Sequence, residues 1–134
     1  MNTDAVTQSQ FVSLNGSAQP VLSRLSYLGG EPFAVNIAFR TDRGRWVEWT
    51  FSRDLLVTGL SEPAGIGDVR VRPDLAADES ILILEIESPD GYALVEIERE
   101  DVERFVAATS EVVPFGAESD SFDIDAFIAE ITSV

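Results

Sequence analysis

Two adjoining segments alternate between large apolar residues and small or polar ones, and this alternation constrains the fold more than any other feature of the chain. Residues 33–40 read "FAVNIAFR" and residues 46–51 read "WVEWTF". A period of two residues is that of a β-strand with one buried face. Between them, "TDRGR" supplies Gly44, which tolerates the positive φ of a hairpin turn. The segments therefore predict an antiparallel hairpin whose core side carries Phe33, Val35, Ile37, Phe39, Val47, Trp49 and Phe51.

Further strands are expected on both sides of this hairpin. Weaker patterns cover 5–14 and 21–27, and stronger ones cover 68–72, 81–87 and 92–98. The last two are joined by Ser-Pro-Asp-Gly, a strong turn signal. The second group of three strands predicts an antiparallel meander.

The C-terminal third changes to the period of a helix. We predict helices over 99–113 and over 123–131, the second with Asp123 as its N-cap. Their apolar sides hold Val102, Phe105, Val106 and Thr109 in the first and Ile124, Phe127, Ile128 and Ile131 in the second. The predicted class is α+β, a single domain spanning 1–134, with two packed antiparallel sheets, a short helix between them and C-terminal helices.

The segment "SRDLLVTGL" at 52–60 places a hydroxyl, a cation and a carboxylate side by side. Ser52 stands where a helix N-cap belongs, Asp54 falls in the first turn, and Gly59 suits a left-handed C-cap. The alternative is a catalytic serine. We favour a short capped helix, because no base is available to activate Ser52.

The chain contains no histidine and no cysteine, and all its basic residues are arginines. This composition excludes Ser-His-Asp and Cys-His catalysis within the chain, as well as thiolate metal sites. Asp120, Asp123 and Asp125 are closely spaced, but they miss the ligand positions of an EF-hand loop and are interpreted as acidic residues at a helix start. We expect no cofactor, no metal and no enzymatic activity, and we expect a reducing, cytoplasmic location.

The net charge of −15 is unevenly distributed. Residues 1–73 hold seven acids and seven arginines, whereas residues 74–134 hold seventeen acids and two arginines. Such a field repels nucleic acids and anionic lipids, so nucleic-acid binding is not expected. No segment approaches the roughly 20 apolar residues of a membrane span, so membrane insertion is not expected either. The acidic half either keeps the protein in solution or attracts a cationic partner surface, and both alternatives stay open.

Two sets of side chains are candidates for contacts with partners. The basic residues cluster at Arg40, Arg43, Arg45, Arg70 and Arg72. They form either cross-strand ion pairs or a partner-facing patch, for which Arg70 and Arg72 are our candidates. Trp46 and Trp49 lie three residues apart on a strand and so point to opposite faces. We expect Trp49 in the core and Trp46 partly exposed, with a stacking platform as the alternative.

The second candidate surface is the outer face of strands 81–87 and 92–98. If Leu82, Leu84 and Ile86 point inward, the outer face carries apolar residues mixed with glutamates, which is unusual for a face in water. Either helices or another subunit cover it. We predict an oligomer interface built from Ile81, Ile83, Tyr92 and Leu94.

Several blocks of the chain resemble the SsgA-like proteins of filamentous actinomycetes. These are "PFAVNIAF", "VEWTFSRDLLVTGL" and "GDVRVRP", followed by "IESPDGYALVEIEREDVERFVAATSEVVPFGAE" and "FDIDAFIAEI". The resemblance spans about residues 20–132. It implies a Whirly-like fold and a homo-oligomer, expected as a trimer.

The same resemblance implies a non-catalytic factor for sporulation-specific septation. Such a factor helps bring the tubulin-like division GTPase to septum sites and contacts other SsgA-like or division proteins. Two other functions are alternatives to a division factor. The Whirly-like fold suggests a single-strand nucleic-acid binder, which the charge disfavours. A carboxylate-pair enzyme acting on peptidoglycan is disfavoured because no export signal is evident.

Overall fold

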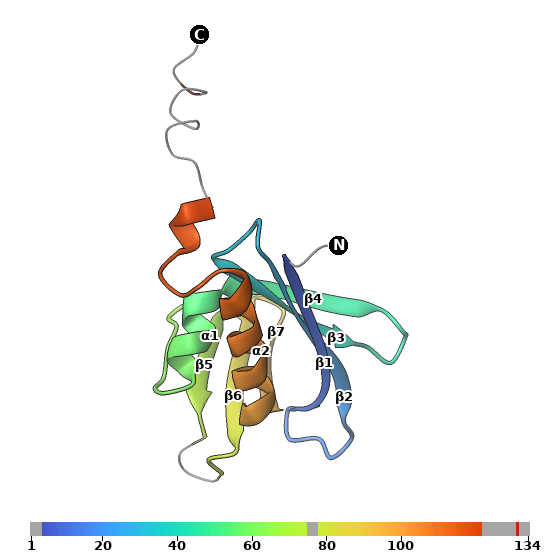
Figure 1. Cartoon of the computed structure of the whole chain (residues 1–134). Coiled ribbons are helices and arrows are strands. Elements are labelled where there is room, and N and C mark those ends of the chain that lie inside the picture. The colour runs from blue at the N-terminus through green and yellow to red at the C-terminus, as the bar shows by residue number, and fades with distance from the viewer. Residues whose placement is uncertain (1–3, 75–77, 122–130, 132–134) are drawn as a thin grey trace.

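The computed structural model describes residues 4–74, 78–121 and 131. Seven strands and two helices follow one another in the predicted order (Figure 1). They are β1 (Ala5–Leu14), β2 (Val21–Leu28), β3 (Ala34–Arg40), β4 (Trp46–Ser52), α1 (Arg53–Gly59), β5 (Val69–Pro73), β6 (Ile81–Ser88), β7 (Gly91–Glu98) and α2 (Arg99–Val112), with a short 3-10 turn η1 (Glu118–Ser121). The helix predicted over 123–131 lies outside the described residues except for Ile131, which is 61% exposed.

The strands form one continuous, curled antiparallel sheet in the order β4-β3-β2-β1-β7-β6-β5. Among the described residues, the strand pairing that joins the two halves, β1–β4 and β5–β7, is that of β1 with β7, through Ser13 with Glu96 and Leu14 with Val95. The α+β class is confirmed, but the expected pair of separate sheets is a single sheet. The reason is the length of β1, whose last residues extend past β2 and hydrogen-bond to the second half.

The predicted hairpin is confirmed as β3–β4, with Arg40 opposite Trp46 at its turn end. Gly44 adopts a φ of 75°, the left-handed region that glycine occupies without a steric penalty. Two residues depart from the predicted core side. Phe33 precedes β3 and is 57% exposed, and Val47, near the turn end of β4, is 46% exposed.

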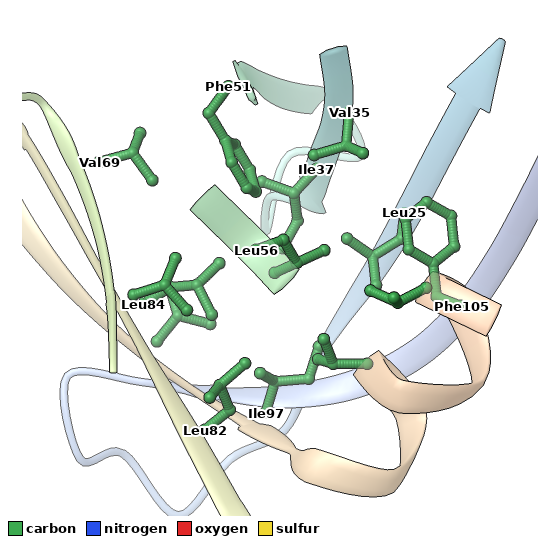
Figure 2. Packing of buried hydrophobic residues seen from close by; sticks show 14 of the residues in the cluster. Leu25, Val35, Ile37, Phe51, Leu56, Val69, Leu82, Leu84, Ile97 and Phe105 are labelled. Atoms are coloured by element: carbon green, nitrogen blue, oxygen red, sulfur yellow. The ribbon is translucent and has the colours of Figure 1, made fainter. Parts of the chain in front are cut away.

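The core lies between the concave face of the sheet and the two helices, with Leu56 of α1 at its centre (Figure 2). Alternate residues of β3 and β6 contribute to it, as the alternation predicts: Val35, Ile37 and Phe39, and Leu82, Leu84 and Ile86. Helix α2 buries Val102, Phe105, Val106 and Thr109, the four residues that the helical period predicted on its apolar side. Both helices therefore pack on the same face of the sheet, and the opposite face of β5–β7 meets neither of them.

Helix α1 begins as predicted and ends differently. Ser52 is the N-cap, since its hydroxyl accepts a hydrogen bond of 3.0 Å from the Leu55 N–H. Gly59, however, does not adopt a left-handed conformation. It is buried against β5, where an added Cβ would lie 2.3 Å from Val71 Cγ1. Glycine is required there for the close approach of helix and strand rather than for a C-cap.

Candidate interaction surfaces

The outer face of β6 and β7 holds the four residues predicted to form an oligomer interface. Ile81 and Leu94 are half-buried, Tyr92 is 48% exposed, and Ile83 is only 6% exposed. Ile83 lies in register between Arg72 of β5 and Glu96 of β7. The apolar surface still accessible on this face therefore belongs to the other three residues.

Arg70 and Arg72 lie on the same outer face and are both in ion pairs. Arg72 Nε is 3.3 Å from Glu85 Oε1, and Arg70 Nη1 is 3.3 Å from Glu87 Oε1. The Tyr92 hydroxyl donates a 2.6 Å hydrogen bond to Glu85, and this bond, with support from Arg72, lowers the pKa of that carboxyl. For these two arginines the structure shows the cross-strand pairing that we weighed against a partner patch.

A cavity of about 800 Å³ opens at the end of the curled sheet away from α2. It lies between the β1–β2 connection, the turn end of β3–β4 and the β6–β7 turn. Its walls are largely apolar, with Phe39 and Trp49 packed against the core and Val47 46% exposed at the rim. Three separate segments form the cavity, so the sequence pattern of any one of them could not reveal it. An open apolar cavity of this kind is suited to binding a protein segment or a small ligand.

Arg53 is the residue that sequence analysis missed. Its guanidinium is buried at 1% exposure between the ends of the two helices. It donates hydrogen bonds to the carbonyl oxygens of Thr109 and Val113, at 3.3 and 2.6 Å, and to Glu118 at 2.6 Å. A positive charge among the last carbonyls of α2 is also favoured by the helix dipole.

Aromatic rings and a carboxylate complete the surroundings of Arg53. The guanidinium lies 5.0 Å from the centre of the Tyr27 ring and 4.8 Å from that of Phe115. Its hydrogen bond lowers the pKa of the Glu118 carboxyl, and burial raises the pKa of the Tyr27 hydroxyl. The central residue of "SRD" therefore ties α1 to the chain that leaves α2, which is a structural role.

Two observations bear on the catalytic and metal-binding alternatives in the described residues. Those residues include no group of three acidic side chains placed to hold a metal ion. The Ser52 oxygen already accepts the capping hydrogen bond of α1. Neither helix in this part of the chain has the length and apolar character needed to cross a membrane.

The fold closely matches two solved structures. One is an SsgA-like sporulation-specific cell division protein from Thermobifida fusca, with a TM-score of 0.81, 34% identity and coverage of 98% of this chain and 99% of that one. The other comes from work on SsgB mutations that correlate with longitudinal cell division during sporulation of Streptomyces coelicolor, with a TM-score of 0.81, 36% identity and coverage of 88% and 95%. The fold is thus that of the SsgA-like proteins.

The sequence comparisons agree. Residues 21–118 match the family model described as "Streptomyces sporulation and cell division protein, SsgA". The chain is 43% identical to the sporulation-specific cell division protein SsgB of Frankia casuarinae, over 85% of this chain and 80% of that protein. It is 39% identical to SsgB of Streptomyces coelicolor, over 86% and 84%. The chain belongs to the SsgA family, and the predicted resemblance is confirmed.

Proposed function

We propose that this protein is a non-catalytic division factor that acts at sporulation septa in the cytoplasm and helps recruit the tubulin-like division GTPase through protein–protein contacts. The observation that carries the proposal is the 39–43% identity to proteins named sporulation-specific cell division protein SsgB, over more than four-fifths of the chain. The absence of histidine, lysine and cysteine from the sequence supports a non-catalytic role.

The rim of the open cavity is the contact surface that best suits such a role. Phe11 and Val47 are large apolar side chains around it, 63% and 46% exposed. Exposed apolar groups of this size, close together, are typical of protein interaction sites.

Self-association is the second part of the proposal. The protein forms a homo-oligomer, a trimer by analogy with the family, that buries the outer face of β6 and β7. The half-buried Ile81 and Leu94 and the exposed Tyr92 support this interface. Substituting Ile83 would not test it, because Ile83 is already buried in a single chain. Tyr92→Arg is the sharper variant, since the new cation can pair with Glu85 and Glu87 in the monomer but is unfavourable inside an interface.

Light scattering after size exclusion measures the oligomer. We expect the wild type to elute as an oligomer and Tyr92→Arg as a monomer with a similar melting temperature. A wild-type monomer at tens of micromolar would refute the self-association.

Single-strand nucleic-acid binding is the alternative, because a Whirly-like fold suggests it and the guanidinium groups of Arg24 and Arg40 lie over the Trp46 ring. A charge of −15 opposes it, since affinity for a phosphate backbone depends on neutralising that backbone with cations. We therefore retain protein contacts as the function.

Binding between the purified protein and the purified GTPase of the same organism tests the proposal. We expect Val47→Asp, at the cavity rim, to abolish binding. Ile66→Asp is the matched control, because Ile66 is fully exposed and does not line the cavity. Wild-type protein that does not bind the GTPase, or two variants that bind equally well, would refute recruitment through this surface.

A further inference from the structure

Four arginines and a tryptophan surround the β3–β4 hairpin, and we name them the arginine–tryptophan patch: Arg24, Arg40, Arg43, Arg45 and Trp46. Arg40 and Trp46 are direct cross-strand partners. The guanidinium carbon of Arg24 lies 4.4 Å from the centre of the Trp46 ring, and that of Arg40 lies 5.7 Å away. Both distances are within the range of cation–π interactions.

The arginines of this patch differ from all the others in the part of the chain that the structure describes. There, Arg53, Arg70, Arg72, Arg99 and Arg104 each form an ion pair, and the four patch arginines form none. A guanidinium stacked on a ring keeps its N–H groups available for a carboxylate. The patch is therefore a cationic area without ion pairs on a chain with a net charge of −15, and Asp42 and Glu48 are the acidic residues of the same hairpin.

The backbone beside this patch is unpaired as well. β4 is an edge strand, bonded only to β3 within the described sheet. At the two ends of the β3–β4 ladder, the Thr41 N–H donates to the Arg45 carbonyl and the Arg53 N–H donates to the Phe33 carbonyl. In an antiparallel pair the hydrogen-bonded residues alternate, so in β4 the backbone groups of residues 47, 49 and 51 bond to β3. The backbone groups of Trp46, Glu48 and Thr50 consequently face away from the sheet.

A strand added to this edge would meet a different surface on each side. One side offers Arg24, Arg40 and Trp46. The other offers Val47 at the rim of the cavity and Trp49 in its wall. Successive side chains of an added strand point to opposite sides. Figure 1 shows the β3–β4 hairpin extending from the body of the molecule, and Val47, Glu48 and Thr50 of β4 are exposed.

We propose that the edge of β4 binds an extended peptide of a partner protein in which acidic residues alternate with large apolar ones. The peptide adds one strand to the sheet, its carboxylates contact the arginine–tryptophan patch, and its apolar side chains contact Val47 and Trp49. Strand addition of this kind derives affinity from main-chain hydrogen bonds and specificity from alternate side chains. The inference goes beyond the proposed function and requires no assumption about septation.

Charge favours a short acidic peptide over a nucleic acid. At physiological salt, charges farther apart than about 8 Å are largely screened, so a short ligand responds chiefly to the patch. A single-stranded nucleic acid carries phosphates beyond the reach of four arginines, and these would meet the acidic half of the chain, residues 74–134.

Fluorescence anisotropy with a labelled synthetic peptide, Asp-Ile-Asp-Phe-Asp-Ile-Asp, tests the ligand class. We expect saturable binding that weakens as salt is raised. A peptide of the same composition with its acids and apolar residues in separate blocks should bind at least about tenfold more weakly, because it cannot match both sides of the strand. Equal binding of the two peptides, or tighter binding of a labelled oligothymidine, would overturn the proposal.

Protein variants test the site. We expect the double variant Arg24→Gln/Arg40→Gln to weaken peptide binding at least about tenfold, because it removes two charge-assisted contacts. Arg70→Gln is the matched control, since Arg70 is already paired with Glu87. A double variant that keeps its melting temperature and binds as tightly as the wild type would overturn the assignment.

Two substitutions at Glu48 distinguish the contribution of the backbone N–H to peptide binding from that of the side-chain charge. Glu48→Pro removes an outward N–H and leaves the ladder to β3 intact, because proline is tolerated at such edge positions. Glu48→Gln removes the same negative charge and keeps the N–H. We expect the proline variant to lose binding and the glutamine variant to bind more tightly than the wild type. Retention of binding by a folded proline variant would show that no strand is added at this edge.

Discussion

Replacing Glu118 by glutamine is expected to destabilise the protein strongly. The change removes the carboxylate 2.6 Å from Arg53 Nη2 and leaves a guanidinium that is 1% exposed. Removing one partner of a buried ion pair costs about 3–5 kcal/mol of unfolding free energy. Arg53 keeps its hydrogen bonds to the Thr109 and Val113 carbonyls, so we expect the lower end, about 3 kcal/mol.

Urea unfolding of the single variants Glu118→Gln and Arg53→Met and of the double variant measures the coupling between the two side chains. We expect the double variant to be more stable than the sum of the single effects predicts, by at least about 1.5 kcal/mol. The matched control is Arg104 with Asp101, a pair with the same 2.6 Å separation whose arginine side chain is 63% exposed. Its coupling should stay below about 1 kcal/mol.

The same variants give a pH dependence whose sign follows from the structure. The folded-state pKa of Glu118 is lowered, so its stabilising contribution is complete above the unfolded-state pKa of about 4.3 and is lost as the pH falls toward the folded-state value. The stability difference between the wild type and Glu118→Gln should be constant from pH 5 to 7 and should shrink below that range. A cost under about 1 kcal/mol at neutral pH, or a coupling equal to that of the exposed control pair, would refute the buried-pair account.

Three further changes have expected outcomes. Ser52→Ala should lower the unfolding free energy by about 1 kcal/mol in urea melts, since it removes the N-cap of α1. Gly59→Ala, which stabilises an ordinary helix interior, should here destabilise by about 1–3 kcal/mol, because the new methyl group collides with Val71; a stabilised variant would contradict the packing. Tyr92→Phe should raise the pKa of Glu85 in an NMR titration, because it removes the largest influence that lowers it. An unchanged Glu85 pKa would show that the arginines Arg72 and Arg70, and not the tyrosine, lower it.

Local periodicity predicts the elements of this fold well. In β3, β4 and α2 one side faces the core, and this sets the period at which apolar residues recur. A few consecutive residues are enough to show that period. The joining of β1 to β7 was missed, because it links residues 13–14 with 95–96 and leaves no local signal.

Two features of the candidate sites could not be derived from the sequence, for physical reasons. Arg53 precedes Leu56 by three residues, so it lies on the same side of α1 as a core leucine, and this spacing was the available signal of its burial. The predicted partner patch at Arg70 and Arg72 could not be distinguished from the patch around Trp46 by sequence, because only the register shows which arginines lie opposite glutamates.

Time-lapse microscopy of a fluorescent fusion to this protein, imaged together with the tubulin-like GTPase in the sporulating actinomycete that encodes it, tests the proposed function most directly. We expect the fusion to form regularly spaced foci at future septa before the GTPase rings appear there. We also expect the rings not to form when the protein is absent. A fusion that stays evenly distributed through the hyphae, or rings that assemble normally without the protein, would contradict the proposed function.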